Sequence, residues 1–205
     1  MGTVGGIRST AGPAVQEKGM KFSRLLPLLG LLLLGACRPA ANGPLYLGRG
    51  VPFVLRSPAD GPPFFASQEV LFRLPDGKEE QLVTSVENDG DHLAVVASTP
   101  MGLTLFTLQL KQGVVTLDER VPLPKLFDPR LLPALIQLSN WPLEDLRKGL
   151  RPDATLDDEG DIRILRRKGK TVLTLRREGA APPYRKTLLE IPSASISAVI
   201  TTLED

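Results

Sequence analysis

The chain has 205 residues, with 25 basic and 23 acidic side chains, a single histidine and a single cysteine. This length fits one domain with its own core. The single cysteine excludes a disulfide framework, and one histidine with one cysteine is too few for a zinc site. The near balance of charge excludes the concentrated basic surface of a nucleic-acid-binding protein.

The first patterned segment is typical of a secretory signal peptide. Met20 is followed by Lys21 and Arg24, and then by an apolar stretch from Leu25 to Ala36. A helix that crosses a bilayer needs ~20 residues, so this shorter stretch indicates a removable signal rather than an anchor. We therefore expect translation to start at Met20, with the glycine-rich residues 1–19 as an upstream extension. Residues 1–36 hold four basic side chains and one acidic side chain, so the remaining chain is close to neutral.

The signal ends in a pattern that resembles the lipobox of bacterial lipoproteins. Its residues are Leu34, Gly35, Ala36 and Cys37. The resemblance implies cleavage before Cys37, a diacylglycerol on the Cys37 sulfur and an acylated new amino terminus. Arg38 stands where an aspartate would retain the protein at an inner membrane. The expected location is therefore the outer membrane, with the domain lipid-anchored and facing the periplasm.

The chain after the signal divides into a short tether and one domain. We expect a tether over residues 37–44 and a single domain over residues 45–205. Residues 46–65 are interrupted by Gly and Pro and predict irregular structure with one short edge strand. Five strand-length runs follow, separated by turns such as Asp-Gly, and they predict successive hairpins. These runs cover residues 66–74, 79–87, 92–99, 103–110 and 114–121.

The hydrophobic period then changes to that of helices. Leucines and Ile136 recur at steps of three and four over residues 128–150. Asp128 is a candidate N-cap, with Pro129 in the first helical position. Pro142 predicts a break, after which Asn140 or Trp141 caps a second short helix.

Four more strand candidates complete the chain, at residues 162–167, 171–177, 184–191 and 196–204. No parallel alternation of strand and helix is visible. The predicted fold is mainly β (α+β): a strongly curved antiparallel sheet, or incomplete barrel, with two short helices inserted between strands.

The sequence offers little for catalysis. A Ser-His-Asp triad would have to use His92 with Ser85 and Asp91, and no nucleophile-elbow pattern surrounds any serine. We therefore interpret His92 as a turn residue and predict no catalytic residue and no cofactor. Residues 153–161 are acidic but lack the spacing of a calcium loop, so we interpret them as a solvated hairpin turn and predict no metal site.

Trp141, at the break between the predicted helices, has two interpretations. It either anchors the core or forms a wall of an apolar ligand cavity, since aliphatic helices under a curved sheet can enclose such pockets.

Residues 131–150 resemble the central signature of a bacterial lipoprotein family known as domain of unknown function 3261. The matching residues are Leu135, Gln137, Leu138, Trp141, Pro142, Leu146 and Leu150. The family's order of strands, helices and strands looks like the lipoprotein-localisation fold of LolA and LolB. This resemblance implies a non-catalytic carrier or acceptor that holds a lipid or acyl chain on its concave side.

A cavity for that chain would be lined by Phe106, Leu131, Leu135, Leu138 and Trp141. The alternative is a tethered structural or protein-interaction lipoprotein with no lipid cavity, which binds an envelope protein through a sheet edge or a basic face. We expect a monomer in either case.

Overall fold

A computed structural model describes residues 37–39, 44–123 and 128–204. The expected signal peptide and the lipobox residues Leu34, Gly35 and Ala36 lie outside the described residues. Contacts divide the chain into two units, Met1–Gly35 and Ala36–Asp205, and the fold below is that of the second. This unit has its own continuous hydrophobic core, as expected of a part that folds by itself.

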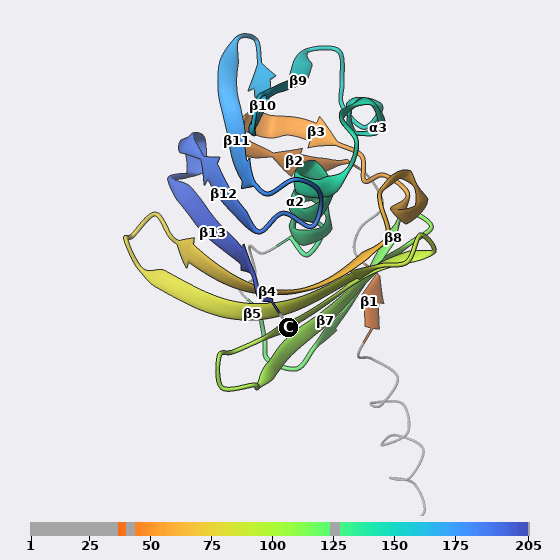
Figure 1. Ribbon diagram of the computed structural model, residues 1–205, viewed down its shortest axis with the longest axis vertical. Helices are drawn as coiled ribbons and strands as arrows, with labels where there is room; N and C mark the ends of the chain where they lie inside the picture. Colours follow the sequence, from red (N-terminus) through yellow and green to blue (C-terminus); the bar gives the residue numbers. More distant parts are fainter. Residues whose placement is uncertain (1–36, 40–43, 124–127, 205) are drawn as a thin grey trace, which may run out of the picture. The chain divides into compact units, whose positions relative to one another are not determined.

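The main element is an eleven-stranded antiparallel sheet (Figure 1). Its order is β1-β8-β7-β6-β5-β4-β13-β12-β11-β10-β9. The strands are β1 (Cys37–Pro39), β4 (Phe64–Arg73), β5 (Glu79–Asn88), β6 (His92–Ser98), β7 (Thr104–Lys111), β8 (Val114–Glu119), β9 (Ala154–Glu159), β10 (Ile162–Arg167), β11 (Lys170–Glu178), β12 (Lys186–Ile191) and β13 (Ile196–Thr202).

Two meanders build this sheet, and the pairing of β4 with β13 joins them. The first meander runs from β4 to β8 and the second from β9 to β13, while Gln68 pairs with Thr202 at the junction. The turns have the predicted chemistry. In the β5–β6 turn, Asp89 Oδ1 accepts the N–H groups of Asp91 and His92, and Gly90 has φ +90°.

Two short helices separate the meanders, α2 (Leu131–Asn140) and α3 (Leu143–Arg147). Figure 1 shows α2 lying inside the curve of the sheet. The predicted fold class is therefore confirmed: a mainly β protein with a curved antiparallel sheet and two inserted helices. Within the described ranges, no helix is long and apolar enough to cross a membrane.

The start of α2 differs from the prediction. The helix begins at Leu131 rather than Pro129, and the side chain of Arg130, in the N-cap position, bonds to Asp128 and does not cap the helix. Asp128 acts one turn earlier, because its Oδ1 accepts the N–H of Arg130 at 3.0 Å. Pro142 ends the helical path as predicted, but it occupies the N-cap position of α3 itself, where we had expected Asn140 or Trp141.

The segment predicted to be irregular contains a buried hairpin. Strands β2 (Leu45–Leu47) and β3 (Val51–Phe53) pair with each other around a 3-10 turn, Gly48–Gly50. Phe53 is fully buried and forms a bridge with Leu150. These strands were hard to predict because Gly and Pro residues flank them and because each strand has only three residues, too few to show a period-two pattern.

The acidic segment after α3 also differs from the prediction. Most of it forms the edge strand β9, and only Gly160 and Asp161 remain in the turn to β10. Its carboxylates pair with arginines: Asp153 with Arg167 and Asp157 with Arg147. Among the described residues, no group of three or more possible ligands could hold a metal ion.

The first residues of the expected tether join the sheet. Cys37–Pro39 form β1, in which Cys37 pairs with Asp118 and Pro39 with Thr116 of β8. The middle of the tether, residues 40–43, lies outside the described residues.

Candidate functional site

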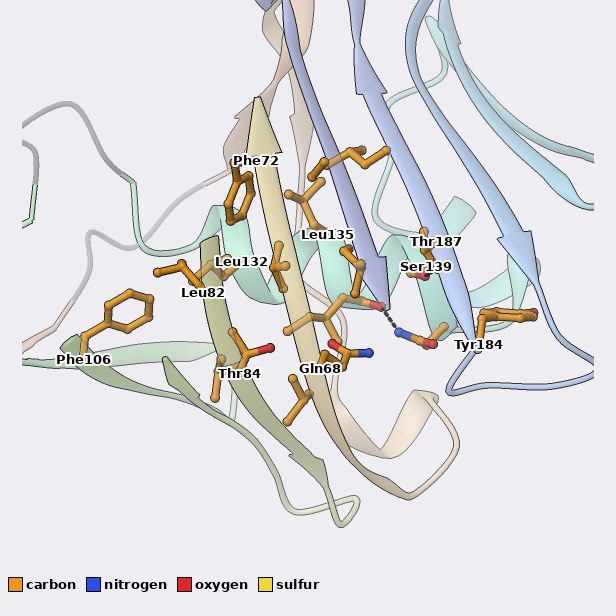
Figure 2. Close-up of a pocket in the computed structure, with 18 residues that line it drawn as sticks. Gln68, Phe72, Leu82, Thr84, Phe106, Leu132, Leu135, Ser139, Tyr184 and Thr187 are labelled. Carbon is orange, nitrogen blue, oxygen red and sulfur yellow. Dashed lines mark hydrogen bonds between the residues drawn. The ribbon is translucent and has the colours of Figure 1, made fainter. Parts of the chain in front are cut away.

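An apolar pocket lies between α2 and the sheet (Figure 2). Its cavity volume is about 60 Å³. Six strands, β4 to β7, β12 and β13, supply its sheet wall, through Gln68, Val70, Phe72, Leu82, Thr84, Val86, Val95, Phe106, Thr187, Leu189, Ala198 and Ile200. The other lining residues are Leu132, Leu135, Ile136, Ser139 and Asn140 of α2 and Tyr184 of the β11–β12 connection.

Sheet geometry explains why these strand residues meet. Alternate residues of a strand point to the same face, so Gln68, Val70 and Phe72 of β4 all face α2. The antiparallel register then places Thr84 of β5 beside Gln68, and Leu82 beside Val70. The pocket wall therefore follows directly from the pairing of the central strands.

The helical wall follows from the spacing of five residues on α2. Leu132, Leu135, Ile136, Ser139 and Asn140 stand at steps of three and four, which places them on one side of a helix. The leucines and Ile136 are only partly buried, whereas Ser139 and Asn140 are buried.

A different side of α2 is fixed by polar contacts. Gln137, which is 0% exposed, accepts the N–H of Arg56 at 2.9 Å and donates to the Arg56 carbonyl at 2.8 Å. Arg163 Nη1 donates to the carbonyl oxygens of Leu138 and Trp141, each at 2.8 Å. These contacts hold the C-terminal half of α2 to β10 and to the segment after β3.

Arg163 is held in turn by a carboxylate. Its Nε and Nη2 donate to the two oxygens of Asp158 at 2.8 and 2.9 Å, and Arg177 Nη2 lies 3.2 Å from the same carboxylate. Burial raises the pKa of Asp158. The hydrogen bond and charge of Arg163 and the charge of Arg177 outweigh this, so the pKa lies below its ordinary 3.8.

The structure separates the five residues predicted to line a cavity. Phe106 and Leu135 line the pocket, whereas Leu131, Leu138 and Trp141 do not. Trp141 is 1% exposed, donates from Nε1 to the Ser57 carbonyl at 3.2 Å and contacts Phe64 edge to face. This environment is that of a core anchor, the first of the two interpretations of Trp141.

The residues considered for chemistry lie elsewhere. His92 begins β6, and its Nδ1 lies 2.8 Å from Asp89 Oδ2 in the β5–β6 turn. The N–H of His92 is the main cause of the lowered pKa of Asp89. For Cys37, the structure describes only the backbone position in β1.

A family model matches most of the second unit. The model described as protein of unknown function (DUF3261) matches residues 66–204, which cover all but the first two residues of β4, the strands β5 to β13 and both helices. The chain belongs to this family. The predicted family assignment is thus confirmed, and the match carries no description of a catalytic activity.

Two solved structures resemble this DUF3261 protein distantly. One is the LolA superfamily protein NE2245 from Nitrosomonas europaea, with 12% identity, a TM-score of 0.38 and coverage of 73% of this chain and 87% of that chain. The other is a putative outer membrane lipoprotein-sorting protein domain from Vibrio parahaemolyticus, with 8% identity, a TM-score of 0.36 and coverage of 68% and 83%. Both TM-scores are below 0.5, so neither likeness decides the fold or the function. No curated protein matches the chain.

Sequence reasoning missed the polar residues of the pocket in this DUF3261 protein. They are Gln68, Thr84, Ser139, Asn140, Tyr184 and Thr187. One pattern could have indicated Ser139 and Asn140, because they continue the leucine-rich side of the helix at steps of seven and eight from Leu132. Nothing in the sequence places Thr187 opposite Ser139, since that contact depends on how the second meander pairs.

Proposed function

We propose that this protein is a non-catalytic envelope lipoprotein that binds an acyl chain between α2 and the curved sheet. The observation that carries this proposal is the pocket itself, because two thirds of its lining residues are apolar and the lining comes from both meanders and α2. Ligand sites in proteins are concave and mostly apolar, with a few placed polar groups. In this role the protein accepts or carries a lipid, and no catalytic step is required.

The pocket must widen to hold a chain. At about 60 Å³ it is smaller than the roughly 150 Å³ cavity that can bind benzene. Each methylene of the chain that is removed from water contributes about 0.8 kcal/mol to the free energy of binding. This contribution offsets the cost of separating the side chains that line the pocket. The half-buried Leu132, Leu135 and Ile136 are the residues that can move aside, because Gln137 and Arg163 fix another side of α2.

The proposed membrane attachment is the lipid on Cys37. One acyl chain binds a membrane only marginally, so the diacylglycerol and the N-acyl chain together would give stable anchoring. Since Cys37 pairs with Asp118 at the edge of the sheet, that anchor would keep the sheet edge close to the bilayer. Arg38 favours the outer membrane as the destination, with the domain in the periplasm.

An exposed turn could contact the bilayer during transfer. Met101 and Leu103, in the turn between β6 and β7, are 97% and 60% exposed. Large apolar side chains so exposed are suited to insert among lipid headgroups. Substituting both with glutamate should reduce transfer of a bound lipid to vesicles without reducing binding in the pocket.

Binding is tested directly on the unit Ala36–Asp205 carrying Cys37→Ser. We expect native mass spectrometry to detect a co-purifying lipid and a fluorescent acyl probe to bind saturably. Leu135→Trp, which fills the pocket, should abolish probe binding. Leu131→Trp is the matched control, because Leu131 lies on the same helix and is also half-buried but does not line the pocket.

Absence of any bound lipid, together with no binding of the probe, would overturn the carrier role. The alternative would then stand: a tethered structural or protein-interaction lipoprotein. The anchor has a separate test, because wild-type protein should incorporate labelled palmitate and fractionate with the outer membrane. Cys37→Ser should do neither.

A further inference from the structure

The pocket has an apolar end and a polar end. Along α2 its lining changes from Leu132 near the start of the helix to Ser139 near its end. Figure 2 shows Ser139, Thr187 and Tyr184 together on one side of the pocket, and Phe106 on the other. Ser139 Oγ and Thr187 Oγ1 lie 3.4 Å apart, so two hydroxyl groups meet at the polar end.

A buried arginine lies beside this polar end. Arg177 of β11 is the register partner of Thr187 in β12, and residues directly opposite each other in an antiparallel pair lie on the same face of the sheet. The guanidinium carbon of Arg177 is 5.1 Å from the centroid of the Tyr184 ring. Arg177 does not line the pocket itself, but it adjoins two residues that do. Its side chain is only 7% exposed, so a guanidinium group is held out of water next to the pocket.

The charge of Arg177 is not balanced within the described ranges of the chain. Asp158 lies 3.2 Å from Arg177 Nη2, but the same carboxylate also accepts two hydrogen bonds from Arg163. Two positive charges therefore share one negative charge. The other carboxylates of β9 are paired with different arginines, Asp157 with Arg147 and Glu159 with Arg166.

Arg177 also keeps a free hydrogen-bond donor. Its Nε is buried, and no described residue accepts a hydrogen bond from it. A buried donor without a partner is unfavourable, and more so when the group is charged. An acceptor supplied by a ligand would satisfy this donor, and a negatively charged acceptor would also balance the second guanidinium.

The end of α2 does not oppose an anion at this place. The C-terminus of a helix carries partial negative charge. Here, however, Arg163 Nη1 donates to the carbonyl oxygens of Leu138 and Trp141, so a full positive charge already offsets it. The hydroxyl groups of Ser139 and Thr187 can both donate to an anion.

We infer that the pocket selects an acyl chain with a carboxylate head over one with an uncharged head, and that Arg177 binds this carboxylate. This inference rests on the proposed function, since it names the class of ligand for the same pocket. The chain would lie toward Phe106, and the head would lie between Thr187 and Tyr184. Because Tyr184 is only partly buried, its ring can turn to open the way to Arg177.

The test compares two probes of equal chain length on the unit Ala36–Asp205 carrying Cys37→Ser. Palmitate carries a carboxylate at neutral pH, and monopalmitoylglycerol has an uncharged head. We expect palmitate to bind at least about tenfold more tightly, as judged by competition against a fluorescent acyl probe. Equal or tighter binding of monopalmitoylglycerol would overturn this inference and leave the carrier role intact. Failure of both probes would instead overturn the carrier role.

A substitution that removes the charge tests the assignment to Arg177. Arg177→Met leaves Arg163 and Asp158 as a balanced pair, and it should remove the preference for palmitate while monopalmitoylglycerol still binds. Arg176→Met is the matched control, because Arg176 is the next residue of β11 and is exposed. It should leave the ratio of the two affinities unchanged. An unchanged ratio in Arg177→Met would show that Arg177 does not bind the head.

A conservative substitution separates charge from packing. Arg177→Lys keeps the positive charge and should keep most of the preference for palmitate. A loss as large as that in Arg177→Met would overturn the role of the charge. If Arg177→Met does not fold, the comparison of the two probes on the unsubstituted Arg177 still decides whether a carboxylate is preferred.

Discussion

The backbone of Gly61 lies directly against the indole ring of Trp141. A Cβ atom on residue 61 would stand 2.2 Å from Trp141 Cε2 and 2.4 Å from Cδ2. Because Gly61 has an ordinary φ of −112°, the requirement for glycine here is steric and does not come from backbone strain. The segment before β4 thus packs against the ring that ends α2.

We predict that Gly61→Ala lowers the free energy of unfolding by about 1–3 kcal/mol. The ring cannot move aside, since Trp141 is buried and its Nε1 is bonded to the Ser57 carbonyl. Denaturant unfolding measures the change. In a Trp141→Leu background, the same substitution should cost much less, because the clashing ring is absent. An equal cost in both backgrounds would contradict this explanation.

The carboxylate of Asp158 binds Arg163, the arginine whose guanidinium holds the end of α2. We predict that Asp158→Asn destabilises the protein by about 3 kcal/mol, because it leaves Arg163, 3% exposed, without its charged partner. Glu159→Gln removes the neighbouring carboxylate from the more exposed pair with Arg166. That control should cost no more than about 1 kcal/mol. Equal losses in the two variants would show that Asp158 has no special role.

The same pair makes the stability depend on pH in acid. The pKa of Asp158 is lower in the folded protein than the ordinary value of 3.8. The stabilisation is therefore complete above pH 3.8 and is lost as the pH falls through the lower folded pKa. Unfolding of wild type and Asp158→Asn should be measured over this range. The difference between them should shrink with acid, and a difference that stays constant would rule out this linkage.

Most of the fold could be predicted from the turn sequences and from the periodicity of the hydrophobic residues. Asp-Gly turns divided the chain into strands whose register is then set by short loops, which is why β4 to β8 could be predicted from local sequence. The pairing of β4 with β13 could not, because it joins residues more than a hundred positions apart. The β2–β3 hairpin, where only one short edge strand was expected, and strand β9 were not predicted, since short or acidic strands leave little alternation to detect.

The candidate site could be predicted only in part because α2 is buried on more than one side. Periodicity identified Leu135 and Leu138 as buried residues, but it does not say which neighbour each one meets. Leu135 faces the pocket, whereas Leu138 packs into the core beside the carbonyl that Arg163 binds. Which side of α2 faces the pocket and which faces the core depends on where β10 and the segment after β3 lie. This is a long-range property of the fold.

Gln137 provides the clearest test of how α2 is attached. Its side-chain amide forms two hydrogen bonds with the backbone of Arg56, at a separation of 81 residues. Gln137→Met keeps the approximate volume but leaves the Arg56 N–H and carbonyl without these partners, and each unsatisfied buried group costs about 1–3 kcal/mol. We therefore predict a loss of about 2–4 kcal/mol in the free energy of unfolding and faster hydrogen exchange at Arg56. Gln81→Met, at an exposed position of β5, should change the stability by no more than about 0.5 kcal/mol. If Gln137→Met is equally mild, then Arg163 and apolar packing hold α2 in place without Gln137.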